Sequence, residues 1–171
     1  MTAAAALQTG ALVIERVDYA DPAQGADLFR LLDHYARDPA GGGKALDPAM
    51  QDALLAGLAA TPGAFSLIAT LEDEAIGLAN CFTGFSTFAA KPLVNIHDVV
   101  VADGHRGRGI GRALFAAIEA EARAIGACKI TLEVLSGNTP AKALYRSLGY
   151  GDFILDPAIG AALFWQKSLN P

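Results

Sequence analysis

The chain has 171 residues, of which 53% are hydrophobic and 18% are charged. This composition is typical of a compact globular domain and excludes an extensively disordered chain. The formal net charge of −5 disfavours nucleic acid as a general partner, which would require a basic face, and mildly favours a cationic ligand.

The length and the absence of a linker predict one domain over residues 11–171, preceded by a disordered alanine-rich tail at residues 1–10. That tail lacks the basic and apolar regions of a signal peptide, and no apolar run approaches the roughly 20 residues of a membrane span. Cys81 and Cys128 lie in apolar runs without metal-ligand spacing. We therefore expect two buried free thiols, no metal, no membrane association and a cytoplasmic location.

The first half of the chain predicts two helices between short strands. Each helix is expected to begin with an aspartate N-cap followed by proline at the first helical position, and a triple glycine at residues 41–43 separates the two. The expected elements in order are a strand over 11–17, helices beginning at Asp21-Pro22 and Asp47-Pro48, strands over 65–71 and 75–82, and a loop through Gly84, Phe85, Phe88 and Pro92.

The second half predicts the same mixture of strands and helices. The expected elements are a strand over 93–101, an amphipathic helix over 109–125, a strand over 128–135, a short helix from Thr139-Pro140 to Gly149, and closing strands over 153–155 and 161–166. One mixed α/β domain is the simplest interpretation of this order.

The most informative stretch is the junction between the strand over 93–101 and the helix behind it. The first N–H groups of a helix have no intrahelical partner and carry partial positive charge, so a phosphate placed there is held by main-chain donors. Glycines remove the Cβ atoms that would obstruct the approach, and arginines add cations. The residues concerned are Gly107, Gly109 and Gly111 with Arg106, Arg108 and Arg112. We interpret them as a pyrophosphate cradle, although such a turn can also be plain solvated surface.

A dinucleotide is the alternative ligand for this cradle. Glu133 follows roughly 20 residues later, where a ribose-binding carboxylate is expected. The fingerprint G-x-G-x-x-G, however, requires a third glycine at the position that Arg112 occupies, and the motif lies on a late strand. The dinucleotide interpretation is therefore a minor one.

Two sequence blocks resemble the GCN5-related N-acetyltransferase (GNAT) superfamily over nearly the whole chain. Arg106, Gly109 and Gly111 match its Arg/Gln-x-x-Gly-x-Gly/Ala signature. About 30 residues later, Asn138, Ala141, Leu144-Tyr145 and Leu148-Gly149-Tyr150 match Asn-x-x-Ala-x-x-Leu-Tyr-x-x-Leu-Gly-Phe. Residues 85–92 look like the diamine and thialysine acetyltransferase branch.

The resemblance implies a mixed, twisted, mostly antiparallel sheet flanked by about four helices. It also implies acetyl-CoA as acetyl donor, a primary amine of a small molecule as acceptor, and direct transfer without an acyl-enzyme. The Val99 N–H is expected to face the developing oxyanion. The expected cofactor-binding residues are Val99, Val100, Val101, Arg106, Gly107, Arg108, Gly109, Ile110, Gly111, Arg112, Asn138 and Tyr145.

For the chemistry, the resemblance makes Tyr145 the candidate general acid for the departing thiolate, whereas its helical face alone would favour a core position. Asn138 is either a ligand of the pantetheine end or a helix cap. The diamine branch carries Glu-Asp in the central strand, where this chain has His97-Asp98. Since successive strand residues point to opposite faces, we expect only one of the two to act as base, and we favour His97.

The acceptor is expected to contact His34, Tyr35, Asp38, Phe85 and Phe88, and the glycines at 41–43 form either a moving loop or a turn. The alternatives to a small-molecule enzyme are peptide or protein N-acetylation, and a non-catalytic acetyl-CoA-binding or sensing module. A homodimer through Phe164 and Trp165 is compatible with the sequence, and so is a core position for both side chains.

Overall fold

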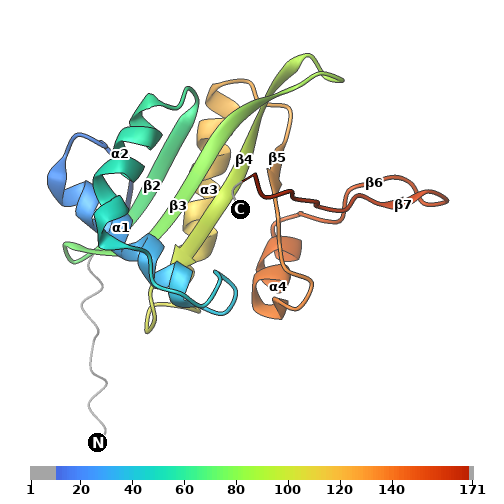
Figure 1. The fold of residues 1–171 in the computed structure, drawn as a ribbon. Coiled ribbons are helices and arrows are strands. Elements are labelled where there is room, and N and C mark those ends of the chain that lie inside the picture. The colour runs from blue at the N-terminus through green and yellow to red at the C-terminus, as the bar shows by residue number, and fades with distance from the viewer. Residues whose placement is uncertain (1–10, 170–171) are drawn as a thin grey trace, which may run out of the picture. The chain divides into compact units, whose positions relative to one another are not determined.

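The structure, a computed structural model, describes residues 11–169 and divides into two compact units, with the boundary between Leu132 and Glu133. Residues 1–10, for which we expected a tail, lie outside the described residues. The first unit holds a five-stranded sheet with three α-helices, and the second holds one α-helix and a two-stranded sheet (Figure 1).

The five strands of the first unit pair in their chain order, β1-β2-β3-β4-β5. All neighbouring pairs are antiparallel except β4 and β5, which are parallel. The predicted mixed, mostly antiparallel sheet is thus confirmed. The elements of this unit are β1 (Val13–Arg16), α1 (Pro22–Arg37), a 3-10 turn (Pro48–Met50), α2 (Gln51–Ala60), β2 (Ala64–Leu71), β3 (Glu74–Ser86), β4 (Lys91–Val101), α3 (Ile110–Ala124) and β5 (Ile130–Leu132).

Helices cover both faces of the sheet, with α1 and α2 on one face and α3 on the other (Figure 1). The Asp21 side chain accepts hydrogen bonds from the first N–H groups of α1, as the Asp-Pro pattern predicts. Leu28 and Leu31 of α1 and Leu58 of α2 then pack against apolar side chains of the sheet, and the buried residues of this cluster from β2, β3 and β4 include Ile68, Ala75, Leu78 and Val100.

The hairpin between β3 and β4 is longer than the sequence predicts. Gly84 and Phe85 belong to β3 and Pro92 belongs to β4, so the expected loop shrinks to residues 87–90. Gly84 and Pro92 suggest a break locally, but Pro92 is tolerated because it is paired with Phe85 near the end of the ladder.

The last elements are shorter than predicted. The strand expected over 128–135 is reduced to the three residues of β5. In the second unit, α4 (Thr139–Ser147) is confirmed, while β6 (Ile154–Asp156) and β7 (Gly160–Ala161) form their own two-stranded sheet, not a continuation of the main one. Phe164 and Trp165 lie beyond β7, outside any strand. Within residues 11–169, no helix is both long enough and apolar enough to span a membrane.

A close approach between β3 and α3 depends on Gly77. A Cβ atom added there would lie 3.1 Å from Leu114 Cδ1, 3.2 Å from Ala69 Cβ and 3.3 Å from Ile110 Cγ2. Gly77 therefore allows the first two turns of α3 to pack directly on the sheet.

We expect Gly77→Val to lower the free energy of unfolding by about 1–3 kcal/mol, because the added methyl groups overpack this contact. Gly57→Ala is the matched control: it lies in α2 with no atom within 4 Å of the added Cβ, so it should raise stability by up to about 1 kcal/mol. Urea unfolding measures both changes. A Gly77→Val protein as stable as the native one would contradict the packing described here.

Candidate active site

The central strand β4 loses its partner on one side halfway along its length. Its parallel pairing with β5 covers Val94, Asn95 and Ile96 only. The remaining residues of β4 continue to pair with β3 up to Val101. Among the described residues of the first unit, no strand pairs with the opposite edge of β4 from residue 97 onward.

A β-bulge at His97 decides which main-chain groups face this open edge. In the ladder with β3, Asn80 pairs with Asp98 and Cys81 with Ile96, so His97 is the extra residue. Before the bulge, the Val94 N–H donates toward β5, to Lys129 O; after it, the Ala102 N–H donates toward β3, to Ile76 O. Because main-chain groups alternate along a strand, those of Val99 and Val101 face the open edge.

The bulge also brings His97 and Asp98 to the same face of the sheet. The Phe82 and His97 rings meet edge to face with centroids 4.8 Å apart, and Asn80 Nδ2 donates to Asp98 Oδ2 at 3.1 Å. Asn80 and Phe82 are alternate residues of β3, and Phe82 packs against the cluster beneath α1 and α2. The expectation that His97 and Asp98 point to opposite faces is therefore wrong, since a bulge breaks the alternation.

The turn after β4 leads into an uncapped helix. Gly107 and Gly109 have φ values of +76° and +86°, and among residues 11–169 no atom lies within 4 Å of a Cβ added at either. Gly109 is the N-cap of α3 and provides no side-chain hydrogen bond, whereas Asp21 and Asn138 cap α1 and α4. Gly111 lies inside the first helical turn. Gly109 therefore gives the first N–H groups of α3 no side-chain cap, which is what a phosphate cradle requires.

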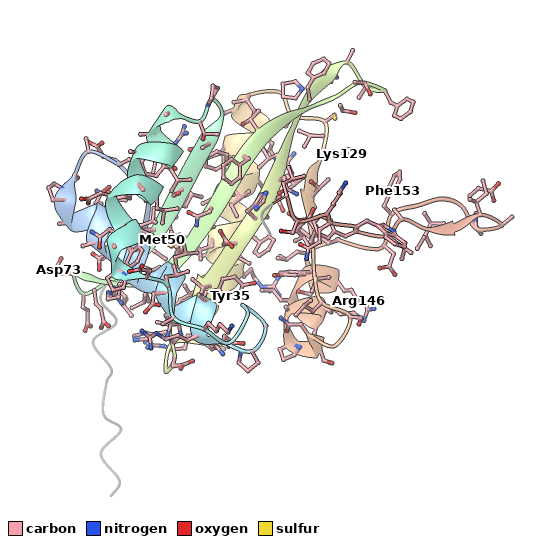
Figure 2. All side chains as sticks on the ribbon, viewed as in Figure 1. Tyr35, Met50, Asp73, Lys129, Arg146 and Phe153 are labelled. Carbon is pink, nitrogen blue, oxygen red and sulfur yellow. The ribbon has the colours of Figure 1, made fainter. Side chains whose placement is uncertain are left out.

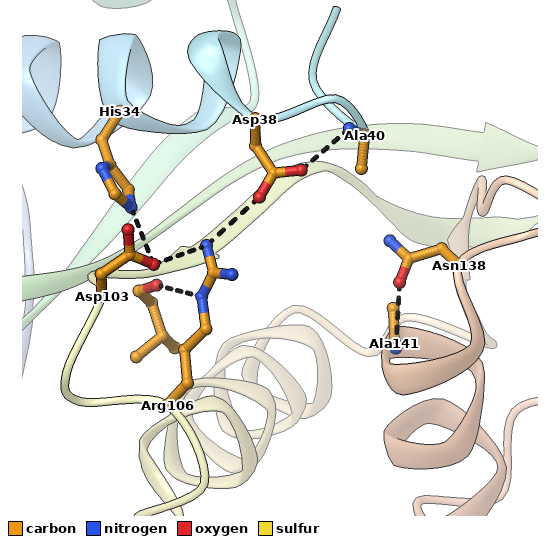
Figure 3. A network of polar contacts seen from close by, with 8 residues as sticks. His34, Asp38, Ala40, Asp103, Arg106, Asn138 and Ala141 are labelled. Atoms are coloured by element: carbon orange, nitrogen blue, oxygen red, sulfur yellow. Dashed lines mark hydrogen bonds and ion pairs between the residues drawn. The ribbon is translucent and has the colours of Figure 1, made fainter. Parts of the chain in front are cut away.

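The arginines of the cradle lie on exposed positions, but the structure gives Arg106 protein partners. Its guanidinium contacts Asp38 Oδ2 at 3.4 Å and Asp103 Oδ1 at 3.3 Å, and its Nε donates to the carbonyl oxygen of Val101 at 3.1 Å (Figure 3). Arg108 contacts His105 Nδ1 at 3.2 Å. Arg106 thus joins the end of α1 to the turn that follows β4.

Three of the five expected acceptor contacts gather at the end of α1. Tyr35 lies on α1 against the sheet (Figure 2), and burial, together with the carboxylates of Asp98 and Asp38, raises its pKa. A hydrogen bond from the Ala40 N–H is the main cause that holds the pKa of Asp38 below its usual range, with Arg106 contributing. His34 Nε2 lies 3.8 Å from Asp103 Oδ1 (Figure 3).

The glycines at 41–43 form a turn bonded to α1. The N–H groups of Gly41 and Gly43 both donate to the carbonyl oxygen of Asp38. A Cβ atom at Gly41 would collide with the carbonyl oxygen of Tyr35. This glycine permits a close main-chain approach.

Phe85 and Phe88 do not lie with His34, Tyr35 and Asp38 at the end of α1. Phe85 lies five residues beyond Asn80 along β3, which at 3.3–3.4 Å per residue is about 17 Å. Phe88 lies in the hairpin loop and is fully exposed. The sequence predicts one loop through residues 84–92, whereas β3 extends to Ser86 and carries Phe85 away from the end of α1.

Two site residues were not recognised in the sequence. Asn80 is an amide inside the otherwise apolar run of β3, and its side chain is 3% exposed. That lone amide was the available signal. Asp103, which contacts both Arg106 and His34, gave no signal because an aspartate in a turn is common.

In the second unit, Asn138 is the N-cap of α4. Its Oδ1 accepts from the Ala141 N–H at 3.2 Å (Figure 3), which is the capping role. Tyr145 is partly exposed, and its ring centroid lies 6.3 Å from that of Tyr150. Within the described part of the chain, α4 has no buried residue.

The two cysteines differ from each other. Both are free thiols, but Cys128 is exposed, so the expectation that it is buried is wrong. Burial, with a smaller contribution from the Asp98 carboxylate, raises the pKa of the Cys81 thiol to about 12. Among residues 11–169, no group of three or more His, Cys, Asp or Glu side chains could hold a metal ion.

The split strand, the bulge and the glycine-rich turn before a helix agree with the sequence blocks described above, and residues 27–150 match the Acetyltransferase (GNAT) family. The chain belongs to this family.

Similar proteins refine the comparison within the GNAT family. A streptothricin acetyltransferase of Streptomyces lavendulae is 41% identical over 78 residues, which are 46% of this chain and 41% of that protein. The chain thus matches less than half the length of this curated relative.

Solved structures share the GNAT fold at low identity. A possible acetyltransferase from Clostridium difficile 630 gives a TM-score of 0.75 at 17% identity, covering 93% of this chain and 99% of that one. An aminoglycoside acetyltransferase from an uncultured soil metagenomic sample gives 0.70 at 20% identity, covering 92% and 97%. These likenesses establish the fold and do not single out the diamine branch.

The difference between the two thiols is testable with Ellman's reagent at pH 8. We expect one thiol per folded chain to react quickly and the second only after unfolding, because a buried thiol with a raised pKa forms almost no thiolate. Cys128→Ser should remove the fast phase. Fast reaction that survives in Cys128→Ser would show that Cys81 is accessible.

Proposed function

We propose that this GNAT-family protein is an acetyl-CoA-dependent N-acetyltransferase that transfers an acetyl group directly to a primary amine of a cationic small molecule. The observation that carries the proposal is the open edge of β4 beyond Ile96, together with the uncapped start of α3 at Ile110, which follows the end of β4 at Val101 through the glycine-rich turn. Main-chain donors are thus available along an extended ligand that ends in a pyrophosphate.

The residues fit acetyl-CoA, which supplies an activated acetyl thioester when bound. The first N–H groups of α3 would hold the pyrophosphate, and the positive-φ glycines leave room for it. Val99 would bind the pantetheine arm with its main-chain groups and Val101 with its N–H, since the Val101 carbonyl oxygen accepts from Arg106. The Val99 N–H would also face the developing oxyanion. Arg108 and Arg112 add positive charge on exposed positions of the same turn and helix.

The acceptor class follows from the groups at the end of α1. Asp98 has no ion-pair partner among the described residues, so its carboxylate suits a protonated amine, and Asp38, which Arg106 pairs, lies at the end of α1. Streptothricin and aminoglycosides, from the names of two similar proteins, join diamines and polyamines as candidate acceptors. The proposal includes a cytoplasmic location, which the two free thiols support.

In the proposed reaction, Tyr145 protonates the departing thiolate, and either His97 or Asp98 accepts the proton of the acceptor amine. No acyl-enzyme is required. A homodimer is compatible with this reaction and is not needed for it.

The test is acetyl-CoA-dependent thiol release across an amine panel of spermidine, putrescine, thialysine, lysine, aminoglycosides, streptothricin and short peptides. We expect turnover with one class of small amine. Tyr145→Phe should lower kcat by about 10²- to 10⁴-fold, the usual contribution of a general acid. Turnover with peptides alone would favour peptide N-acetylation, and tight acetyl-CoA binding without turnover would favour a sensing module. Full activity of Tyr145→Phe would exclude Tyr145 as the acid.

The cradle makes a separate prediction for acetyl-CoA binding. Gly109→Ala forces a side chain into a left-handed conformation at the start of α3 and places a methyl group in the phosphate path. We expect the Kd for acetyl-CoA, measured by calorimetry, to rise at least about tenfold, which corresponds to about 1.4 kcal/mol.

Gly126→Ala is the matched control for the cradle. Gly126 follows the other end of α3, also has a positive φ (+69°), and has open space around an added Cβ. It should therefore lower stability to a similar extent and leave the Kd for acetyl-CoA within twofold. Equal loss of affinity in the two variants would contradict the cradle.

A further inference from the structure

A chain of hydrogen bonds crosses three strands of the sheet and ends on Asp98. Tyr19 Oη lies 2.9 Å from Ser66 Oγ, Ser66 Oγ donates to Asn80 Oδ1 at 2.6 Å, and Asn80 Nδ2 donates to Asp98 Oδ2 at 3.1 Å. Ser66 and Asn80 are only 1% and 3% exposed. Both lie on the face beneath α1 and α2, among apolar side chains.

All donors in this series of hydrogen bonds point toward the Asp98 carboxylate. Ser66 has one hydroxyl proton, and it is given to Asn80, so Tyr19 must donate to Ser66. The Asn80 amide is thereby fixed: Ser66 binds its oxygen and leaves its NH₂ group for Asp98. Aligned hydrogen bonds of this kind strengthen one another in a buried environment.

These hydrogen bonds orient the Asp98 carboxylate, but they cannot carry a proton to or from it. An amide nitrogen does not pass a proton along, so Asn80 interrupts any transfer between Ser66 and Asp98. Oδ2 is the oxygen that is bound, and within residues 11–169 no hydrogen bond reaches Oδ1. Asp98 is partly exposed, so Oδ1 is held at a defined place with its lone pairs available.

His97 lacks such support. It is exposed and contacts the edge of Phe82, and in the described part of the chain no hydrogen bond orients either ring nitrogen. A histidine that serves as a base is normally fixed by a hydrogen bond to its second nitrogen.

We infer that Tyr19, Ser66 and Asn80 are positioning residues that hold the Asp98 carboxylate, and that Asp98, not His97, takes the proton of the acceptor ammonium. This inference rests on the proposed function and assigns a role within it. Polar groups in an apolar layer are destabilising unless they are fully hydrogen-bonded. Packing alone does not explain why Tyr19, Ser66 and Asn80 are all hydrogen-bonded in a series that ends on the Asp98 carboxylate.

Proton transfer to Asp98 precedes acetyl transfer in the reaction. The acceptor R–NH₃⁺ gives one proton to Asp98 and becomes R–NH₂. Its nitrogen then forms a bond to the acetyl carbon while the carbon–sulfur bond breaks, and the nitrogen loses its second proton as the thiolate gains one. Asp98 returns its proton to solvent, so the products are R–NH–acetyl, the free thiol and one proton.

The decisive experiment is a double-mutant cycle on kcat with the best amine of the panel. Asp98→Asn keeps the shape and an oxygen for Asn80 to donate to, and should lower kcat by about 10²- to 10⁴-fold. His97→Gln should lower kcat at least about tenfold less than Asp98→Asn does. Ser66→Ala should lower kcat by about 3- to 10-fold in the native background, because Asp98 loses its fixed orientation. In the Asp98→Asn background it should change kcat by less than about twofold.

A second variant and a binding measurement distinguish a loss of positioning from a failure of the variant to fold. Tyr19→Phe removes the outer donor of the chain and should reproduce the loss and its dependence on Asp98 if Ser66→Ala does not fold. The Kd for acetyl-CoA should stay within twofold in each variant. The same fractional loss from Ser66→Ala in both backgrounds would show a merely structural role and overturn the positioning.

Two further outcomes would overturn the assignment of Asp98. One is native-like turnover by Asp98→Asn, and the other is a larger loss in His97→Gln than in Asp98→Asn. Either leaves the proposed acetyltransferase activity standing, because native turnover is measured in the same experiment. Acetyl-CoA binding without native turnover on any amine would overturn the proposed function, and this inference with it.

Discussion

The extra residue at His97 in β4 is the constraint on which the arrangement of the site depends. Without it, the alternation set by Val94 would carry on, and Asp98 and Val100 would face the open edge of the strand. Their side chains would also follow strict alternation, which would separate His97 from Asp98. One inserted residue therefore determines both the main-chain groups offered along the edge and the pair of side chains beside them. The pairing with β5 ends at Ile96, so no strand of the first unit's described residues pairs with that edge beyond it.

The helices show two opposite uses of the same physical requirement. Asp21 and Asn138 satisfy the first N–H groups of their helices with side-chain oxygens, which stabilises each helix by about 1 kcal/mol. Gly109 lacks a side chain, so it provides no such capping bond to the first N–H groups of α3 and does not stabilise the helix in this way. Gly77 then allows the same end of α3 to pack closely on the sheet. The uncapped helix end is thus fixed in place by packing, since its own cap does not support it.

Much of the fold and the cradle could be predicted because both depend on local patterns. Aspartate followed by proline marks the start of α1, and glycines before an amphipathic run mark α3, whatever the rest of the chain does. The bulge could not be predicted, because it exists only in the pairing of β4 with β3. The length of β5 depends likewise on β4. Gly84 and Pro92 suggested a loop, yet Pro92 O accepts from Cys128 N, so the missing N–H of this proline faces away from β3.

The polar chain across the sheet has a consequence for how the strands find their alignment during folding. Ser66, Asn80 and Asp98 are direct partners in the two ladders. A slip of one residue would turn apolar side chains outward, and the hydrophobic pattern opposes it, but a slip of two residues preserves that pattern. Such a slip of β2 against β3 would set Ser66 against Leu78 or Phe82 and break the hydrogen bond between Ser66 and Asn80. Two polar groups would then lack a partner in an apolar layer, at a cost of about 1–3 kcal/mol for each. The residues that orient a carboxylate thereby also exclude the misaligned sheet that hydrophobicity alone would tolerate.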